Sequence, residues 1–205
     1  MTLTLCLVLT PGYVTPSFEY SLDGGRTWVP ITSTYLAPGD LDPKPVAEVA
    51  YTTHTAIWNA KAQIPEVYSS TTKIRVTVDD REAANNLSQA VSANFILDTK
   101  NPTRGIPPFS INASVSPAQL TINASDNSLF QMRIGFQSDL SDASWEDYSN
   151  SKTISLPSGS SVTLYYKYRD IYGNITPIFS ATTPEKPVGF IIQDTSNLTA
   201  SPVKY

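Results

Sequence analysis

Residues 73–103 read KIRVTVDDREAANNLSQAVSANFILDTKNPT, and this stretch decides the fold. Residues 73–78 and 91–97 place apolar side chains at every second position, the period of half-buried antiparallel strands. The second segment puts Val91, Ala93, Phe95 and Leu97 on its inner face. Residues 79–89 between the two strands are too many for a tight hairpin. Pro102 ends the pairing because it has no amide hydrogen, so we predict a domain boundary there.

The composition favours an all-β chain with two cores. The chain has 205 residues, of which 40% are hydrophobic and 10% aromatic, enough for two domains of ordinary size. Its 16 prolines are spread along the chain, and no window carries a helical apolar stripe. The opening residues 1–10 alternate apolar and polar side chains and lack a basic start, so we predict a strand and not a secretion signal.

Charge and cysteine content exclude several classes of function. The net charge is −4 and the lysines and arginines form no basic cluster, so nucleic acid is not an expected partner. A single cysteine, Cys6, rules out an internal disulfide. No apolar run approaches the ~20 residues that cross a bilayer, so we expect no membrane span.

The strand plan of the anchor stretch occurs twice. Residues 18–22 match residues 130–136, each followed by a polar turn and then a tryptophan, Trp28 or Trp145. Residues 162–168 match residues 73–78, and Tyr166 and Tyr168 are expected to point inward. Residues 10–16 are predicted as a turn, and the prolines at 107 and 108 as a stiff junction. Roughly seven short strands per unit, with turn signals between them, predict tandem immunoglobulin-like β-sandwiches.

Three strings carry a family resemblance: YSLDGGRTWVPI (residues 20–31), KIRVTVDD with ANFILDTKNPT (within residues 73–103), and SWEDYSNSKTISLPSGSSVTLYYKYRDIYGNIT (residues 144–176). The second contains a D-T-x-x-P exit at Asp98, and the third contains a D-x-x-G-N turn at Asp170. They resemble the bacterial immunoglobulin-like and fibronectin type III-like repeats of large secreted surface proteins. Residues 79–82 depart from the pattern, because they lack the Gly-Asn turn. The resemblance implies an extracellular, non-enzymatic stalk, spacer, surface-lattice or filament subunit. Its partners would be neighbouring copies or repeats, or cell-surface glycans.

These patterns predict three parts of the chain. Residues 1–101 form a first sandwich that lacks its first strand, and residues 102–183 form a second sandwich. Residues 184–205 comprise a linker and the first strand, VGFIIQ at 188–193, of a truncated third domain. Either the chain is an excerpt of a longer array, or the strand at 188–193 adds to the open edge near residues 1–10 of a neighbouring copy.

No residue pattern predicts catalysis. The single histidine, His54, lies in a predicted strand without partners for a triad or a zinc site. The carboxylates lie in turns, where they accept hydrogen bonds from backbone amides. Trp28 and Trp145 are interpreted as packing residues. The alternative is an adhesin or carbohydrate-binding module that uses these rings or the long loop at residues 32–45.

Four aspartates predict a calcium site at the junction of the two sandwiches. Asp23, Asp98, Asp126 and Asp170 all lie in turns that an immunoglobulin-like topology brings to that end. Calcium is a hard cation that prefers carboxylate and carbonyl oxygens. The alternative is that each aspartate caps only its own turn.

Overall fold

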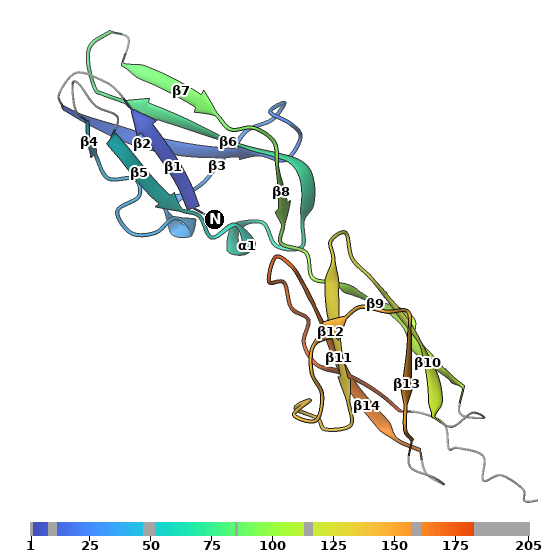
Figure 1. Ribbon diagram of the computed structural model, residues 1–205. Coiled ribbons are helices and arrows are strands. Elements are labelled where there is room, and N and C mark those ends of the chain that lie inside the picture. The colour runs from blue at the N-terminus through green and yellow to red at the C-terminus, as the bar shows by residue number, and fades with distance from the viewer. Residues whose placement is uncertain are drawn as a thin grey trace, which may run out of the picture. The chain divides into compact units, whose positions relative to one another are not determined.

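The structure is a computed structural model in which strands dominate (Figure 1). Its described residues are 2–7, 12–46, 52–84, 86–112, 117–156 and 161–182. The helices in these ranges are a 3-10 turn at Ser33–Tyr35 and α1 at Ala60–Gln63. Neither is long or apolar enough to cross a membrane. The predicted all-β class is confirmed, whereas the predicted strand at 188–193 lies outside the described residues.

Contacts between residues divide the chain into two compact units. The first comprises the described residues of Met1–Pro102, Asp126–Leu129 and Arg169–Thr176. The second comprises those of Thr103–Ser125, Phe130–Tyr168 and Pro177–Tyr205. Two short segments therefore belong to the first unit by their contacts, although they interrupt the sequence of the second.

Eight strands lie in the described part of the first unit. They are β1 (Thr2–Leu7), β2 (Gly12–Ser21), β3 (Val29–Pro30), β4 (Lys44–Val46), β5 (Thr52–Ile57), β6 (Tyr68–Asp79), β7 (Leu87–Val91) and β8 (Phe95–Asp98). One sheet is the antiparallel pair β1-β5, which confirms a strand at residues 2–7. The other has the order β3-β2-β6-β7, with β4 added to β2 and β8 added to β6.

The core of the first unit is built around Trp58, which is 1% exposed. Its ring stacks on Tyr20 of β2 with centroids 5.2 Å apart. Ile74 of β6 and Ala56 of β5 belong to the same buried cluster, so both sheets contribute to one core. The indole Nε1 donates to Gln63 Oε1 of α1 at 2.8 Å, which satisfies its buried donor. The first unit is therefore a β-sandwich.

The strand predicted at residues 91–97 is two strands, β7 and β8. Both pair with β6, but at Ser92 the Ile74 amide donates to the side-chain Oγ at 3.0 Å, and the ladder is interrupted. Leu97 is buried as predicted, whereas Val91 is 51% exposed and Ala93 is also exposed. The prediction of an inner face for these two residues was wrong. Val91 ends β7, an edge strand that buries neither face, and Ala93 lies in the connection between β7 and β8.

The turn predicted at residues 10–16 was also wrong over its described part. Residues 12–16 belong to β2, and Val14 is fully buried against Val46 and Val78. Pro16 lies between the stretches where β2 pairs with β4 and with β3, so that side of the ladder is incomplete around it. A proline is tolerated in a strand where a ladder hydrogen bond is not required.

Seven strands lie in the described part of the second unit and form two sheets. Their bounds are β9 (Thr103–Asn112), β10 (Ala118–Ser125), β11 (Phe130–Gly135), β12 (Glu146–Asp147), β13 (Ser151–Ile154), β14 (Thr163–Asp170) and β15 (Phe179–Thr182). The sheet orders are β13-β10-β9 and β12-β11-β14-β15. One core joins their inner faces, with Leu120 from the first sheet and Met132 and Tyr166 from the second. The inward orientation of Tyr166 and Tyr168 is confirmed, since both are fully buried.

Strand β9 was not predicted, because Pro107 and Pro108 indicated a rigid junction there. Both prolines lie inside the strand. β9 is the edge of its sheet, and its register with β10 is interrupted between Ile122 and Ala124. An edge strand can carry prolines because one of its sides needs no donors.

Candidate metal centre

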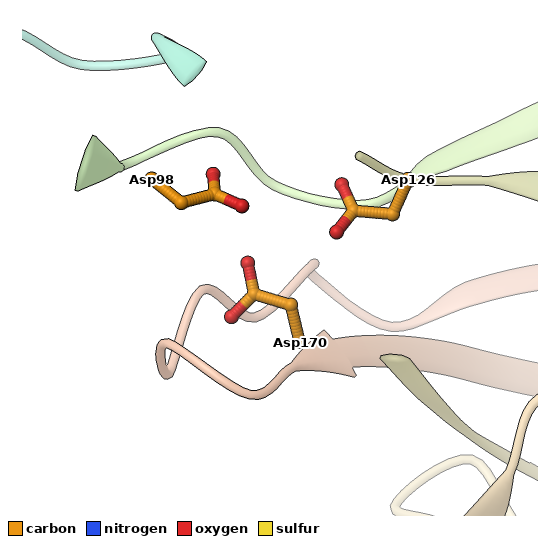
Figure 2. Close-up of side chains that lie close together, drawn as sticks. All are labelled: Asp98, Asp126 and Asp170. Atoms are coloured by element: carbon orange, nitrogen blue, oxygen red, sulfur yellow. The ribbon is translucent and has the colours of Figure 1, made fainter. Parts of the chain in front are cut away.

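Three of the four predicted aspartates lie together in the first unit. Asp98, Asp126 and Asp170 each offer a carboxylate oxygen, and these oxygens all lie within 4.8 Å of one another. Figure 2 shows the three carboxylates gathered around a common space. Among the described residues, no other group of His, Cys, Asp or Glu side chains is arranged to hold a metal ion.

Asp98 is the last residue of β8 and is 7% exposed. Its Oδ1 accepts a hydrogen bond from the Lys100 amide at 3.0 Å, and its Oδ2 accepts one from the Ser128 hydroxyl. The next residue, Thr99, donates its hydroxyl to the Ile64 carbonyl at 2.6 Å and accepts from the Val67 amide at 3.0 Å. These bonds anchor the end of β8 and hold the Asp98 carboxylate in place.

Asp170 ends β14 and is 5% exposed. Its Oδ1 accepts from the Tyr172 and Asn174 amides, both at 2.8 Å, and its Oδ2 accepts from Asn174 Nδ2 at 2.7 Å. Gly173 has a φ of +86°, a conformation that glycine adopts without a steric penalty. The D-x-x-G-N motif therefore forms a tight turn that orients this carboxylate.

Asn174 is a residue of this centre that the site prediction missed. It is 2% exposed, and its Nδ2 donates both to Asp170 Oδ2 and to the Asp98 carbonyl, the latter at 3.0 Å. Its Oδ1 accepts from Lys61 Nζ at 2.7 Å. The sequence carried a signal, since Asn174 ends the D-x-x-G-N motif, but the motif was interpreted only as a turn.

Of the three carboxylates, that of Asp126 accepts the fewest hydrogen bonds from the described residues. It lies in the turn between β10 and β11, where its Oδ2 accepts from the Ser128 amide at 3.0 Å. Its Oδ1 is buried and has no hydrogen-bond partner among the described residues. Burial raises the pKa of this carboxyl; the Ser128 amide opposes the shift, and the charges of Asp98 and Asp170 add to it. The arrangement thus disfavours an ionised Asp126.

No direct ion pair with the three carboxylates is observed among the described residues, since Arg75–Glu19 and Lys152–Glu146 involve none of them. Lys61 is a nearby positive charge, but its Nζ donates to Asn174 Oδ1 and not to a carboxylate. At an effective dielectric constant of ~20, two unit charges 4.8 Å apart repel by about 3 kcal/mol. Either a proton on Asp126 or a bound cation would relieve this repulsion.

The spacing of the oxygens suits calcium. Calcium binds oxygen at about 2.3–2.6 Å, so two oxygens on opposite sides of one ion lie at most about 5 Å apart. Oxygens that all lie within 4.8 Å of one another can reach one calcium ion after small side-chain shifts. The cluster can supply three of the roughly six to eight oxygens that calcium takes, and carbonyls and water would supply the others.

Asp23 does not belong to this group. Its Oδ1 accepts from the Ser21 hydroxyl at 2.7 Å and from the amides of Arg26 and Thr27, and its Oδ2 accepts from the Thr27 hydroxyl at 2.7 Å. Hydrogen bonds from Thr27 are the main cause of a lowered pKa at Asp23. Asp23 therefore stabilises its own turn, as the alternative interpretation of the four aspartates expected.

The other residues considered from the sequence have structural contacts. His54 Nε2 is 2.8 Å from the Pro45 carbonyl oxygen. The Arg75 guanidinium lies 4.5 Å from the ring centre of Trp28, and Lys167 Nζ lies 5.4 Å from that of Trp145. A cation therefore covers one face of each tryptophan where a sugar ring would stack.

Comparison with known proteins adds no assignment for this chain. No protein-family model matches the sequence, and no curated protein is significantly similar to it. Conclusions about function therefore depend on the geometry of the described residues.

Proposed function

We propose that this chain is a non-enzymatic, extracellular structural protein made of immunoglobulin-like sandwiches and stabilised by calcium. It would serve as a stalk, spacer, surface-lattice or filament subunit. The observation that carries the proposal is the group of Asp98, Asp126 and Asp170, in which one buried oxygen lacks a partner among the described residues. A divalent cation would neutralise the excess charge and provide that partner.

The strand order of the second unit supports the immunoglobulin-like part of the proposal. Its sheets β13-β10-β9 and β12-β11-β14-β15 correspond to strands E-B-A and C′-C-F-G of such a sandwich. In the first unit, β5-β1 and β3-β2-β6-β7 follow the same order without a strand at the first position among the described residues. The tryptophans agree with this correspondence, because Trp28 lies against Arg75 of β6 and Trp145 against Lys167 of β14.

The connectivity of the chain supports a stabilising role for the ion. Asp126 and Asp170 lie in segments 126–129 and 169–176, which are continuous in sequence with strands of the second unit. Asp98 ends β8 of the first unit. A bound ion would therefore hold together three chain segments that are far apart in sequence. Because this arrangement of carboxylates exists only in the folded chain, binding would favour the folded state.

An extracellular location is consistent with the chemistry of the proposed site. Calcium sites in extracellular modules have dissociation constants of about 10⁻⁴–10⁻³ M, matched to the calcium outside cells. Three carboxylates, each held by hydrogen bonds, are compatible with affinity in this range. Calcium outside cells would then occupy the site in a large fraction of the molecules and would stabilise the module.

Calcium is expected to raise the melting temperature of the full chain after treatment with a chelator. At a free calcium concentration of 100 times the dissociation constant, the stabilisation is about 2.7 kcal/mol. For a chain of this size that corresponds to a shift of roughly 5–10 °C. Differential scanning calorimetry and isothermal titration calorimetry would measure the shift and the affinity.

The matched control is Asp80→Asn. Asp80 Oδ1 accepts from the Glu82 amide two residues ahead at 3.0 Å, the same turn geometry as Asp126 with Ser128, but Asp80 lies outside the cluster. This variant should keep the full calcium response. A wild-type chain whose melting temperature is the same in millimolar calcium and in chelator would refute the proposed calcium role.

A further inference from the structure

We propose that the outer edge of β1 binds residues 188–193 of a second copy of this chain as an added antiparallel strand. β1 pairs with β5 on one side, from Thr2↔Ile57 to Leu7↔Thr52. No described strand pairs with its other side. Within the described part of the chain, the backbone amides and carbonyls along that side have no strand partner, and a strand edge of this kind can pair with another strand.

The second unit indicates what belongs at this position. Its strand β10 corresponds to β1. One side of β10 pairs with β13, as one side of β1 pairs with β5. On its other side β10 pairs antiparallel with β9, from Gln119↔Asn112 to Ser125↔Thr103. The outer side of β1 is therefore the position that a β9-like strand occupies in the second unit.

The sequence of β1 does not protect this edge. Its residues, TLTLCL, include no charge, proline or glycine. Other edges carry such residues: Pro30 in β3, Pro107 in β9, Lys152 in β13 and the acidic pair Glu146–Asp147 in β12. Charges and prolines at edges oppose the addition of further strands, so β1 differs from these edges in permitting it.

Three other edges, β5 (TTHTAI), β7 (LSQAV) and β15 (FSAT), are also uncharged. The counterpart of β5 is β13, and β7 and β15 are counterparts of each other; among the described strands, each of these ends its sheet without an outer neighbour. The comparison of the two units therefore assigns an added strand to β1 and not to these edges.

The occupant is the segment VGFIIQ at residues 188–193. It has six residues, as β1 does, contains no charge and follows Pro187. Its apolar and β-branched residues have high strand propensity. An uncharged strand can lie beside the uncharged β1 without electrostatic cost.

Residues 183–187 separate the segment from Thr182, which is the last described residue and pairs with Thr163 of β14. A second copy can present the segment to β1 without any constraint from this short connection. Head-to-tail addition of this kind would produce chains of subunits.

Disulfide mapping tests the proposal directly, because Cys6 in β1 is the only native cysteine. One cysteine at a time is introduced at positions 188 to 193 of the full chain, and each variant is oxidised mildly. Covalent dimers and longer chains through Cys6 are expected chiefly at the one position that lies opposite Cys6 in the pairing, because a disulfide needs Cα atoms about 4.4–6.8 Å apart. The positions immediately before and after it point to the opposite face and should not cross-link. Leu198→Cys, in the same tail but outside the segment, is the control.

A second measurement does not depend on the introduced cysteines. In chelator, so that calcium plays no part, light scattering should show a mass that increases with concentration for the wild-type chain. The double variant Ile191→Pro, Ile192→Pro should remain a monomer, because proline removes ladder donors. The control Leu198→Pro should assemble as the wild type does.

Three results would overturn the proposal. The first is cross-linking at positions 188–193 no greater than at position 198, together with an unchanged monomeric mass. The second is a disulfide formed within a single chain, which would assign the edge to the chain's own tail. The third is cross-linking of a tail cysteine to Gln89→Cys in a Cys6→Ser background but not to Cys6, which would assign the added strand to β7.

Discussion

Replacement of Trp58 by alanine is expected to lower the free energy of unfolding of the first unit by about 3–5 kcal/mol. The ring is 1% exposed, it stacks on Tyr20, and its Nε1 satisfies Gln63 Oε1. The substitution removes the largest fully buried side chain of the unit and leaves a cavity that both sheets line. Urea denaturation, followed by far-ultraviolet circular dichroism, would measure the change.

Trp28→Ala is the matched control, since it is the same substitution at a partly exposed ring. Trp28 contacts the Arg75 guanidinium at its surface, an interaction of about 0.5–1 kcal/mol. A loss of stability at Trp28 equal to that at Trp58 would contradict the assignment of Trp58 as the centre of the core. The second unit has its own buried cluster, so its unfolding transition should change little in either variant.

The parts of the fold that the sequence predicted are those governed by local patterns. Alternation places Ile74 and Val78 of β6, and Leu164, Tyr166 and Tyr168 of β14, in the two cores. Gly24 and Gly25 adopt positive φ in the turn between β2 and β3, as their sequence context predicts. These features depend only on the period of a strand and on the conformational freedom of glycine.

The parts that the sequence did not predict depend on position within a sheet. Pro16 and the prolines of β9 indicated turns, but a proline at an incomplete or edge ladder is compatible with a strand. Val91 and Ala93 follow the inward pattern yet lie exposed at the edge of the sheet. Trp58 follows β5 directly, and no local pattern distinguishes it from the other two tryptophans.

The candidate site also combines residues that local sequence patterns predict with residues whose role depends on contacts distant in sequence. Asp98, Asp126 and Asp170 were predicted because each lies at the end of a strand or in the following turn, where carboxylates from different strands can meet. Asp23 satisfied the same criterion, but its carboxylate is not among the three that lie within 4.8 Å of one another. The role of Asn174 required knowledge of its contact with the Asp98 carbonyl, which is 76 residues away in sequence.

Asp126→Asn is expected to remove most of the stabilisation by calcium at the lowest structural cost. The amide has the shape of the carboxyl and keeps an oxygen to accept from the Ser128 amide, but it removes one of the three clustered charges. In chelator, the variant should therefore be more stable than the wild type at neutral pH. In calcium, it should lose most of the stabilisation. A 10-fold weaker affinity reduces a shift of about 2.7 kcal/mol to about 1.4 kcal/mol, and a 100-fold weaker affinity reduces it to about 0.4 kcal/mol.

The pH dependence of the difference between wild type and Asp126→Asn identifies the cause. Burial raises the pKa of Asp126 in the folded chain above its value of about 3.9 in the unfolded chain. The free energy of unfolding of the wild type, relative to that of Asp126→Asn, should therefore fall as pH rises from about 3.9 through the pKa in the folded chain. Below about pH 3.9 both states are protonated, and in chelator the variant should have no advantage. Calcium should act in the opposite sense, because it binds the ionised carboxylates, so its stabilisation of the wild type should increase with pH.

Chemical denaturation of wild type, Asp126→Asn and Asp80→Asn across pH 3–8, with and without calcium, would test both dependences. If Asp126→Asn and Asp80→Asn behave alike under all these conditions, Asp126 only caps its turn and the three carboxylates do not form a cation site.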